Sequence, residues 1–348
     1  MNVRLPHVAA ICSLLIAACS GGDPDAPAQG ITPGGGGTKD PPATSGGGSG
    51  GTPTTPTTPT TPSTPTQSDT WTDGKVLTSS VDIVAGAVIT IAPGAKITAN
   101  AGVTITVHGA IEAAAKDKHA KISGTGWGGI VVATGGALTL SGVDLDGGGI
   151  QANTGNKAAT YDYATITTGA FVVDKGAKLD THHAAFVQGG STTVSGAFTA
   201  SYLDYAGSDI TLLDPAATVS VADSKLTASG GDFFVSSSGA LLHVEYSVIT
   251  GSHCPFHFNA LGKYTLDHVA TRGNGYGQMF YNPESTPNTI SYSSFEDPSF
   301  DQTGRSNEID IDHSYIKAKS TVGIVKITTP ASSPVAAAAP RGTPGPKG

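Results

Sequence analysis

Apolar and polar residues alternate through most of the chain between Trp71 and Thr328. Short runs at 88–91, 103–107 and 138–140 place an apolar side chain at every second position, a spacing that predicts β-strands and not helices. The strand pattern recurs at intervals of roughly 22 residues, which is typical of solenoids whose coils stack as parallel sheets. Because a propeller needs about twice that period for each blade, we predict a solenoid.

The repeats align without gaps in the second half of the chain. Residues 243–252 and 265–274 correspond at every position, and 289–297 and 310–317 follow the same pattern. The alignment predicts an inward-facing column of apolar residues, formed by Val244, Leu266, Ile290 and Ile311. The expected fold class is all-β, a single-domain parallel β-helix of about eleven coils in which each coil is buried against the next.

The first coils carry a pattern of their own. Residues 90–113, TIAPGAKITANAGVTITVHGAIEA, are followed by WGGIVV at 127–132. These stretches resemble the N-terminal coils of right-handed parallel β-helix surface proteins of the pectin-lyase-like superfamily, and the resemblance covers most of 75–325. It implies a right-handed coil. Because this architecture includes lyases, hydrolases, adhesins and inert stalks, it leaves the function open.

The N-terminal 18 residues are predicted to be a targeting signal. Arg4 is followed by an apolar run at 8–18 that is too short to span a bilayer. The run ends in Ile-Ala-Ala-Cys at 16–19, which resembles the lipobox of bacterial lipoproteins and implies that Cys19 is lipidated. Ser20 after it is typical of outer-membrane sorting. We therefore expect a protein anchored by its lipid in the bacterial outer membrane, either surface-exposed or facing the periplasm.

Two segments flanking the predicted β-helix have the composition of disordered chain. Residues 19–70 are mostly Gly, Pro, Thr and Ser, so they bury too little apolar surface to offset the entropy of ordering. They are predicted to form a tether between the lipid and the folded body at 71–328. The Pro- and Ala-rich residues 329–348 are predicted to form a disordered tail.

Composition and charge narrow the classes of function. Charged residues make up 13% of the 348, and Lys and Arg number 19 against 27 Asp and Glu, which gives a net charge of −8. The acidic balance argues against a nucleic-acid partner. No phosphate-binding or dinucleotide motif is present, so we expect no cofactor. Once the leader is removed and Cys19 is acylated, Cys254 is the only thiol left, which excludes an intramolecular disulfide.

Equivalent positions of successive coils predict a ladder of rings and polar groups. Its members are Tyr202, Asp223, Tyr246, His268, Tyr292 and His313, with His183 before them. Stacked residues in neighbouring coils lie about 4.8 Å apart. One interpretation is a structural stack that fixes the register of the coils, and the other is an aromatic platform for carbohydrate.

A second ladder predicts an acidic strip on the outer face, because the residues beside the inward column must point outward. Its candidate binding residues are His243, Glu245, Asp267, Asp310 and Asp312. The simplest interpretation is a solvated polar face. Carboxylates at this spacing also suit a calcium ion or a sugar, and Glu245 with Asp267 are candidates for an acid/base pair of the kind used by glycosidases.

Two further groups carry candidate chemistry. Arg272 is a candidate lyase base, but the alignment places it beside Glu296 on the next coil, where an ion pair is the simpler explanation. In the motif HCPFH at 253–257, His253, Cys254 and His257 are candidate ligands for zinc or copper, although a lone Cys among aromatic residues is more often part of the core.

Two hypotheses follow for the function. The first, which we favour, is a lipid-anchored, surface-displayed β-helix that serves as a non-catalytic adhesive, scaffold or glycan-contacting element of the envelope. Its partners are the membrane, through the lipid, and a polysaccharide or another envelope protein. The alternative is an enzyme, a polysaccharide lyase or glycoside hydrolase that works on the acidic face through Glu245, Asp267 and Arg272.

Overall fold

The structure, a computed structural model, describes the chain from residue 68 onward. The described residues are 68–236, 239–258, 263–280, 288–301, 309–318, 321–322 and 325–347. All of them belong to one compact unit, Thr58–Gly348. The predicted leader 1–18, the predicted lipidation site Cys19 and nearly all of the predicted tether 19–70 lie outside the described residues. Within the described part, every regular element is a β-strand, and no helix there could cross a bilayer.

The strands form three parallel sheets, called sheets one, two and three. Sheet one has 13 strands: β1 (Asp69–Trp71), β4 (Val88–Ile91), β7 (Ala110–Ala114), β10 (Ala137–Ser141), β13 (Ala158–Asp162), β16 (Lys178–His182), β19 (Ala197–Ser201), β22 (Thr218–Ala222), β25 (Leu241–Glu245), β28 (Lys263–Asp267), β31 (Asn288–Ser291), β34 (Ile309–Asp312) and β37 (Val325–Ile327). Sheet two has 12: β2 (Val76–Leu77), β5 (Lys96–Ala99), β8 (Ala120–Ser123), β11 (Val143–Asp146), β14 (Thr165–Thr167), β17 (Ala185–Gly189), β20 (Asp204–Gly207), β23 (Lys225–Ala228), β26 (Val248–Thr250), β29 (Ala270–Thr271), β32 (Ser294–Phe295) and β35 (Tyr315–Ile316). Sheet three has 12: β3 (Val81–Ile83), β6 (Thr104–Val107), β9 (Gly129–Val132), β12 (Ile150–Ala152), β15 (Phe171–Val173), β18 (Thr192–Val194), β21 (Ile210–Leu212), β24 (Phe234–Ser236), β27 (Phe256–Phe258), β30 (Gly277–Phe280), β33 (Ser299–Asp301) and β36 (Thr321–Val322).

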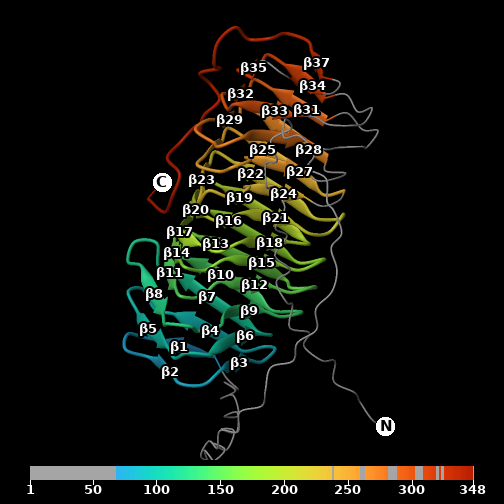
Figure 1. The fold of residues 1–348 in the computed structure, drawn as a ribbon. Coiled ribbons are helices and arrows are strands. Elements are labelled where there is room, and N and C mark those ends of the chain that lie inside the picture. Colours follow the sequence, from blue (N-terminus) through green and yellow to red (C-terminus); the bar gives the residue numbers. More distant parts are fainter. Residues whose placement is uncertain are drawn as a thin grey trace, which may run out of the picture. The chain divides into compact units, whose positions relative to one another are not determined.

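Each strand pairs with the strand three places further along the chain, so three consecutive strands make one coil (Figure 1). The fold is a right-handed parallel β-solenoid, as predicted. The described residues form twelve three-strand coils followed by β37, slightly more than the eleven coils expected. The number of residues in a coil varies along the solenoid. Ile111 pairs with Leu138 across one of the longer coils, whereas Ile311 pairs with Ile327 across a shorter one.

The predicted inward column is confirmed. Val244, Leu266, Ile290 and Ile311 follow one another in register on neighbouring strands of sheet one. All four side chains are at most 1% exposed. Burying a side chain of this size contributes about 1.5–3 kcal/mol, so the repeated column, and not any local contact, supplies most of the driving force for stacking.

The C-terminal segment 328–347 differs from the prediction of a disordered tail. It runs back along the stack, past the last coils and toward the middle of the solenoid (Figure 1). Its backbone donates hydrogen bonds from Ala331 to Ser314 O (3.0 Å), from Val335 to Ser294 Oγ (2.6 Å) and from Gly345 to Tyr202 O (2.7 Å). Composition alone predicted disorder because the segment has little apolar surface, but polar anchors on the solenoid hold it.

Val335 and Ala338 add a small apolar contact to these anchors. Together with Ala339 they pack against Val248 of β26 and Ala270 of β29, separately from the main core. Both strand residues lie at the start of sheet-two strands, beside the corner where sheet one ends. The segment therefore follows this corner, and we call it the docked tail.

Candidate functional site

The corner between sheets one and two carries the predicted ladder of rings. Each predicted ladder residue directly follows a sheet-one strand and has a positive φ, and the structure adds Tyr163, which the alignment did not include; the full set is Tyr163, His183, Tyr202, Asp223, Tyr246, His268, Tyr292 and His313. This left-handed conformation costs a non-glycine residue roughly 1–2 kcal/mol. The turn that it makes lets each corner N–H reach the next coil, as from Tyr246 to Asp267 O (3.0 Å) and from Tyr292 to Asp312 O (3.1 Å).

The rings of the corner stack face to face. Tyr246 and His268 have ring centroids 4.3 Å apart, His268 and Tyr292 5.0 Å, and Tyr292 and His313 4.8 Å, with interplanar angles of 13° to 17°. A second run, in which His183 lies 5.1 Å from Tyr163 and 4.5 Å from Tyr202, stacks the same way. Since neighbouring rings cover one another's faces, few ring faces are left for a sugar, which favours the structural interpretation.

A serine behind the corner supports the turn from inside. It immediately follows the ladder residue in four coils, at Ser224, Ser247, Ser293 and Ser314, and each is at most 2% exposed. The hydroxyl of Ser247 donates to Glu245 O (2.8 Å) and accepts from the N–H of Ser224 on the preceding coil (3.1 Å). The buried hydroxyls therefore pair backbone groups that the corner would otherwise leave unsatisfied.

The ring stack is interrupted at Asp223, and Arg341 of the docked tail fills the gap. The guanidinium Nε donates to Asp223 Oδ1 (2.7 Å) and Nη2 donates to Oδ2 (2.6 Å), in a two-pronged ion pair. Arg341 Cζ also lies 3.8 Å from the ring centroid of Tyr246. On the other side, a Cβ at Gly342 would lie 2.7 Å from Cε1 of Tyr202, so the tail fits closely between the two tyrosines.

The contact between Asp223 and Arg341 stabilises the charged form of both side chains. Burial raises the pKa of the Asp223 carboxyl, but hydrogen bonds from Arg341 outweigh it, so the pKa lies below the usual value. The same hydrogen bonds raise the pKa of Arg341. The Asp223 side chain is 4% exposed, and a carboxylate so buried requires a charged partner.

The outer strip of acidic residues is present in the predicted register. His243 pairs with Thr265 and Glu245 with Asp267, and further along Asp310 and Asp312 lie on β34. Among the described residues of the strip, Glu245 and Asp267 are the carboxylates paired between neighbouring strands, and Ser291 separates Asp267 from Asp312. The strip is therefore interrupted and does not form the continuous row of carboxylates that was predicted as a possible calcium- or sugar-binding face.

The carboxylates of this strip also have partners. Glu245 lies 3.5 Å from Arg341 Nη2 and 3.9 Å from His243 Nε2. Asp267 lies 3.0 Å from His268 Nδ1 and accepts a hydrogen bond from Ser291 Oγ (2.7 Å). A hydrogen bond with the neighbouring His313 lowers the pKa of Asp312. An acid/base pair would need two carboxyls in contrasting surroundings, whereas Glu245 and Asp267 both contact polar or basic side chains of the same corner.

Arg272 lies on the other side of the corner from the acidic strip. It follows β29 of sheet two and is exposed, and Glu296 follows β32 on the next coil. Both side chains belong to the described residues, and no ion pair is found between them there, so the predicted pair is not formed. The contacts described for this region do not bring Arg272 to Glu245 or Asp267 either.

The HCPFH motif forms a compact polar cluster with a residue that the sequence reasoning missed. Asp232, in the turn before β24, joins Cys254 and His257, and one donor atom from each lies within 4.8 Å of the others. His257 Nδ1 lies 2.6 Å from Asp232 Oδ2, and His253 Nδ1 lies 3.3 Å from Asp232 Oδ1. Burial raises the pKa of Asp232, but the hydrogen bond with His257 outweighs it and leaves the value at about 2.

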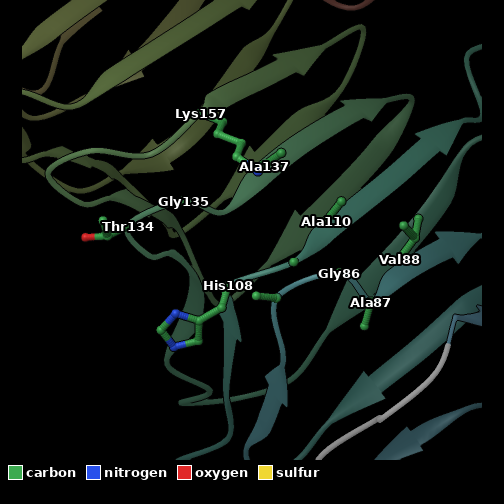
Figure 2. A pocket seen from close by; sticks show the side chains of 11 residues that line it. Gly86, Ala87, Val88, His108, Ala110, Thr134, Gly135, Ala137 and Lys157 are labelled. Atoms are coloured by element: carbon green, nitrogen blue, oxygen red, sulfur yellow. The ribbon is translucent and has the colours of Figure 1, made fainter.

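A shallow hollow of about 350 Å³ lies near the N-terminal end of the solenoid (Figure 2). Its wall consists mainly of glycine, alanine and other small residues from turns of several coils. The two long polar side chains in it are His108, after β6, and Lys157, before β13. None of the predicted site residues contributes to this hollow, and it offers no convergent set of reactive groups.

Comparisons of this chain with protein-family models, with curated proteins and with solved structures find no match. Inference about function therefore rests on the geometry of the corner, the strip and the polar cluster.

Proposed function

We propose that this chain is a lipid-anchored β-helix displayed on the bacterial envelope, where it acts as a non-catalytic adhesive, scaffold or glycan-contacting element. The resemblance of residues 16–19 to a lipobox supports the anchor at Cys19, and the Gly- and Pro-rich composition of 19–70 supports a tether. The resemblance of 90–113 to the pectin-lyase-like superfamily, together with the parallel solenoid, supports membership of that group of surface proteins.

The observation that carries the non-catalytic part of the proposal is the pairing of the candidate catalytic groups. Glu245 and Asp267 each contact partners from their own corner, and Arg272 lies beyond that corner. Catalytic acids and bases need pKa values separated by their surroundings and a position in a cleft. The paired groups instead form a rigid outer face of the solenoid. The side chains of Glu245 and Asp267 remain about 30% exposed on it, so a partner could still contact them.

The anchor can be tested in a Gram-negative host by metabolic labelling with a palmitate analogue. We expect the wild-type chain to take up label and to sediment with outer-membrane fractions. The Cys19→Ala variant should lose the label and appear in a soluble fraction while keeping the same β-rich circular dichroism. An unlabelled wild-type chain in the cytosol would contradict the proposed anchoring.

The surface role can be tested with the purified chain on a panel of acidic and neutral envelope polysaccharides, with and without calcium. The proposal predicts retention of at least one polymer without release of oligosaccharides. Neither Asp267→Asn nor Arg272→Ala should change the amount of oligosaccharide released, because the proposal expects none to be released by the wild type. Oligosaccharide release that disappears in either variant would establish the enzyme hypothesis instead.

A further inference from the structure

Two neighbouring coils bring four possible metal-binding side chains together at the start of sheet three. Phe234 of β24 pairs with Phe256 of β27, so Asp232 lies opposite Cys254, two residues before the paired position in each strand. His257 follows within β27, and its side chain reaches back to Asp232. The cluster therefore depends on the register between two coils and not on the HCPFH motif alone.

The donor atoms are already close to one another. A carboxylate oxygen of Asp232, Sγ of Cys254 and a ring nitrogen of His257 all lie within 4.8 Å of each other. His253 borders this three-residue group without belonging to it: its Nδ1 lies 3.3 Å from Cys254 Sγ and 3.3 Å from Asp232 Oδ1. In a tetrahedral zinc site with bonds of about 2.0–2.3 Å, neighbouring ligand atoms lie roughly 3.3–3.8 Å apart. The atoms of Asp232, Cys254 and His257 are within about 1 Å of that spacing.

We propose that Asp232, Cys254 and His257 form a binding site for a tetrahedral divalent transition metal, with Zn²⁺ as the best match and with the neighbouring His253 or a water molecule in the fourth position. A thiolate and imidazole nitrogens select Zn²⁺ over calcium or magnesium, which prefer oxygen ligands alone. The site would join the coil of β24 to the coil of β27.

Burial and exposure suit a structural metal site with a path for entry. Cys254 is fully buried and His257 is 8% exposed, so a bound ion would be shielded from water on that side. The side chains of Asp232 and His253 are 27% and 44% exposed, which leaves an opening toward solvent. The same burial argues against Cys254 as a nucleophile, since a substrate could not reach its sulfur.

Binding would exchange protons for the metal. The Cys254 thiol would lose its proton to solvent and bind as thiolate, and His257, like His253 where it takes the fourth position, would bind as a neutral imidazole. Asp232 would bind through a carboxylate oxygen, and its Oδ2 lies 2.6 Å from His257 Nδ1. Only protons leave and a divalent cation enters, with no change in oxidation state, so no oxidant or other reactant is needed.

The test is a Co²⁺ titration of the full-length chain in which Cys12→Ser and Cys19→Ser leave Cys254 as the only thiol. We expect one equivalent of Co²⁺ to bind, with a thiolate-to-cobalt charge-transfer band and tetrahedral ligand-field absorption, and Zn²⁺ to displace it. The band should be unchanged in a further His108→Gln variant, because His108 is an exposed histidine far from the cluster along the chain. Absence of the band, or its persistence in Cys254→Ser, would overturn the proposal.

A second measurement guards against misfolding of the cysteine variant. Asp232→Asn preserves the shape of the side chain but removes its charge. Excess Zn²⁺ should raise the thermal midpoint of the parent and of His108→Gln, whereas Asp232→Asn should show at least a tenfold weaker zinc affinity. Equal zinc-dependent stabilisation of all three proteins would show adventitious surface binding and would refute the site.

Discussion

Arg341 completes the ring ladder at the coil where Asp223 stands in place of a ring. The two residues are 118 positions apart, yet the guanidinium both pairs with the carboxylate and lies over the ring of Tyr246. A planar guanidinium can replace an aromatic ring in a stack, because it is flat and attracted to ring faces. The docked tail is thus fixed by the one ladder position that lacks a ring.

Replacing Arg341 should release the docked tail. In Arg341→Lys the positive charge remains but the two-pronged hydrogen bonding and the flat contact with Tyr246 are lost. We expect backbone amides of 335–345 to exchange with deuterium at least tenfold faster than in the wild type, with little change in β25 and β28. Lys347→Ala, an exposed tail residue, is the matched control and should exchange like the wild type. If Arg341→Lys kept full protection, the ion pair would not be the anchor.

The contact between Asp223 and Arg341 should make docking of the tail weaken at acid pH. The folded-state pKa of Asp223 lies below its usual value, because hydrogen bonds from Arg341 outweigh burial. Such a depressed pKa means that the carboxylate's contribution to stability is complete above the usual pKa, about 3.9, and is lost as pH falls through the lower folded value. The amide signal of Arg341, whose N–H donates to Asp223 Oδ1, should stay at its docked position at neutral pH and move below about pH 4 when followed by NMR.

The Asp223→Asn variant provides the control for this titration. Asn has the same size and tolerates a positive φ, so the corner itself is preserved. Its tail signals should lie near undocked positions already at neutral pH and show no transition in the acid range. The same acid transition in Asp223→Asn would assign the effect to other carboxyl groups.

The strain of the corner can be measured at Tyr292, where φ is 47°. Tyr292→Ala and Tyr292→Gly both remove the stacking contacts with His268 and His313. Only glycine also relieves the left-handed conformation, so its free energy of unfolding should exceed that of the alanine variant by about 1 kcal/mol. Denaturant unfolding of both variants gives the comparison.

The same pair of substitutions at Thr289 gives the opposite expectation. Thr289 lies within β31 and has no positive φ, so the alanine variant should be more stable than the glycine variant there. If Tyr292→Ala had a free energy of unfolding equal to or greater than that of Tyr292→Gly, the corner would not carry the backbone strain that its φ indicates.

The repeats revealed the solenoid and the order of side chains along it. The alignment placed Val244 beside Leu266 and Glu245 beside Asp267, and both pairs are found in register. It could do so because a solenoid converts a fixed sequence interval into a contact between neighbours. Even the ring ladder could be predicted, although its left-handed backbone could not, because Tyr rarely adopts that conformation without support.

Contacts outside the repeat could not be predicted. Arg341 belongs to a segment without apolar periodicity, and nothing local indicates its partner Asp223. Asp232 could not be found from the HCPFH motif, because it lies on the preceding coil and no local spacing links it to Cys254 and His257. Carrying the alignment one coil upstream, so that Phe234 matches Phe256, would have placed Asp232 opposite Cys254.

The most direct test of the stacked register is cysteine crosslinking on the outer face of sheet one, in a chain with Cys12→Ser and Cys19→Ser. His243 and Thr265 are register partners on neighbouring strands, whereas Thr289 lies one strand further. Neighbouring strands are about 4.8 Å apart, within the range of about 4.4–6.8 Å that a disulfide spans, and two strands are roughly twice as far. Mass spectrometry after mild oxidation should find a crosslink in His243→Cys/Thr265→Cys and almost none in His243→Cys/Thr289→Cys. Equal crosslinking of the two pairs, or crosslinking of the second alone, would contradict the register on which the ladder, the acidic strip and the metal site depend.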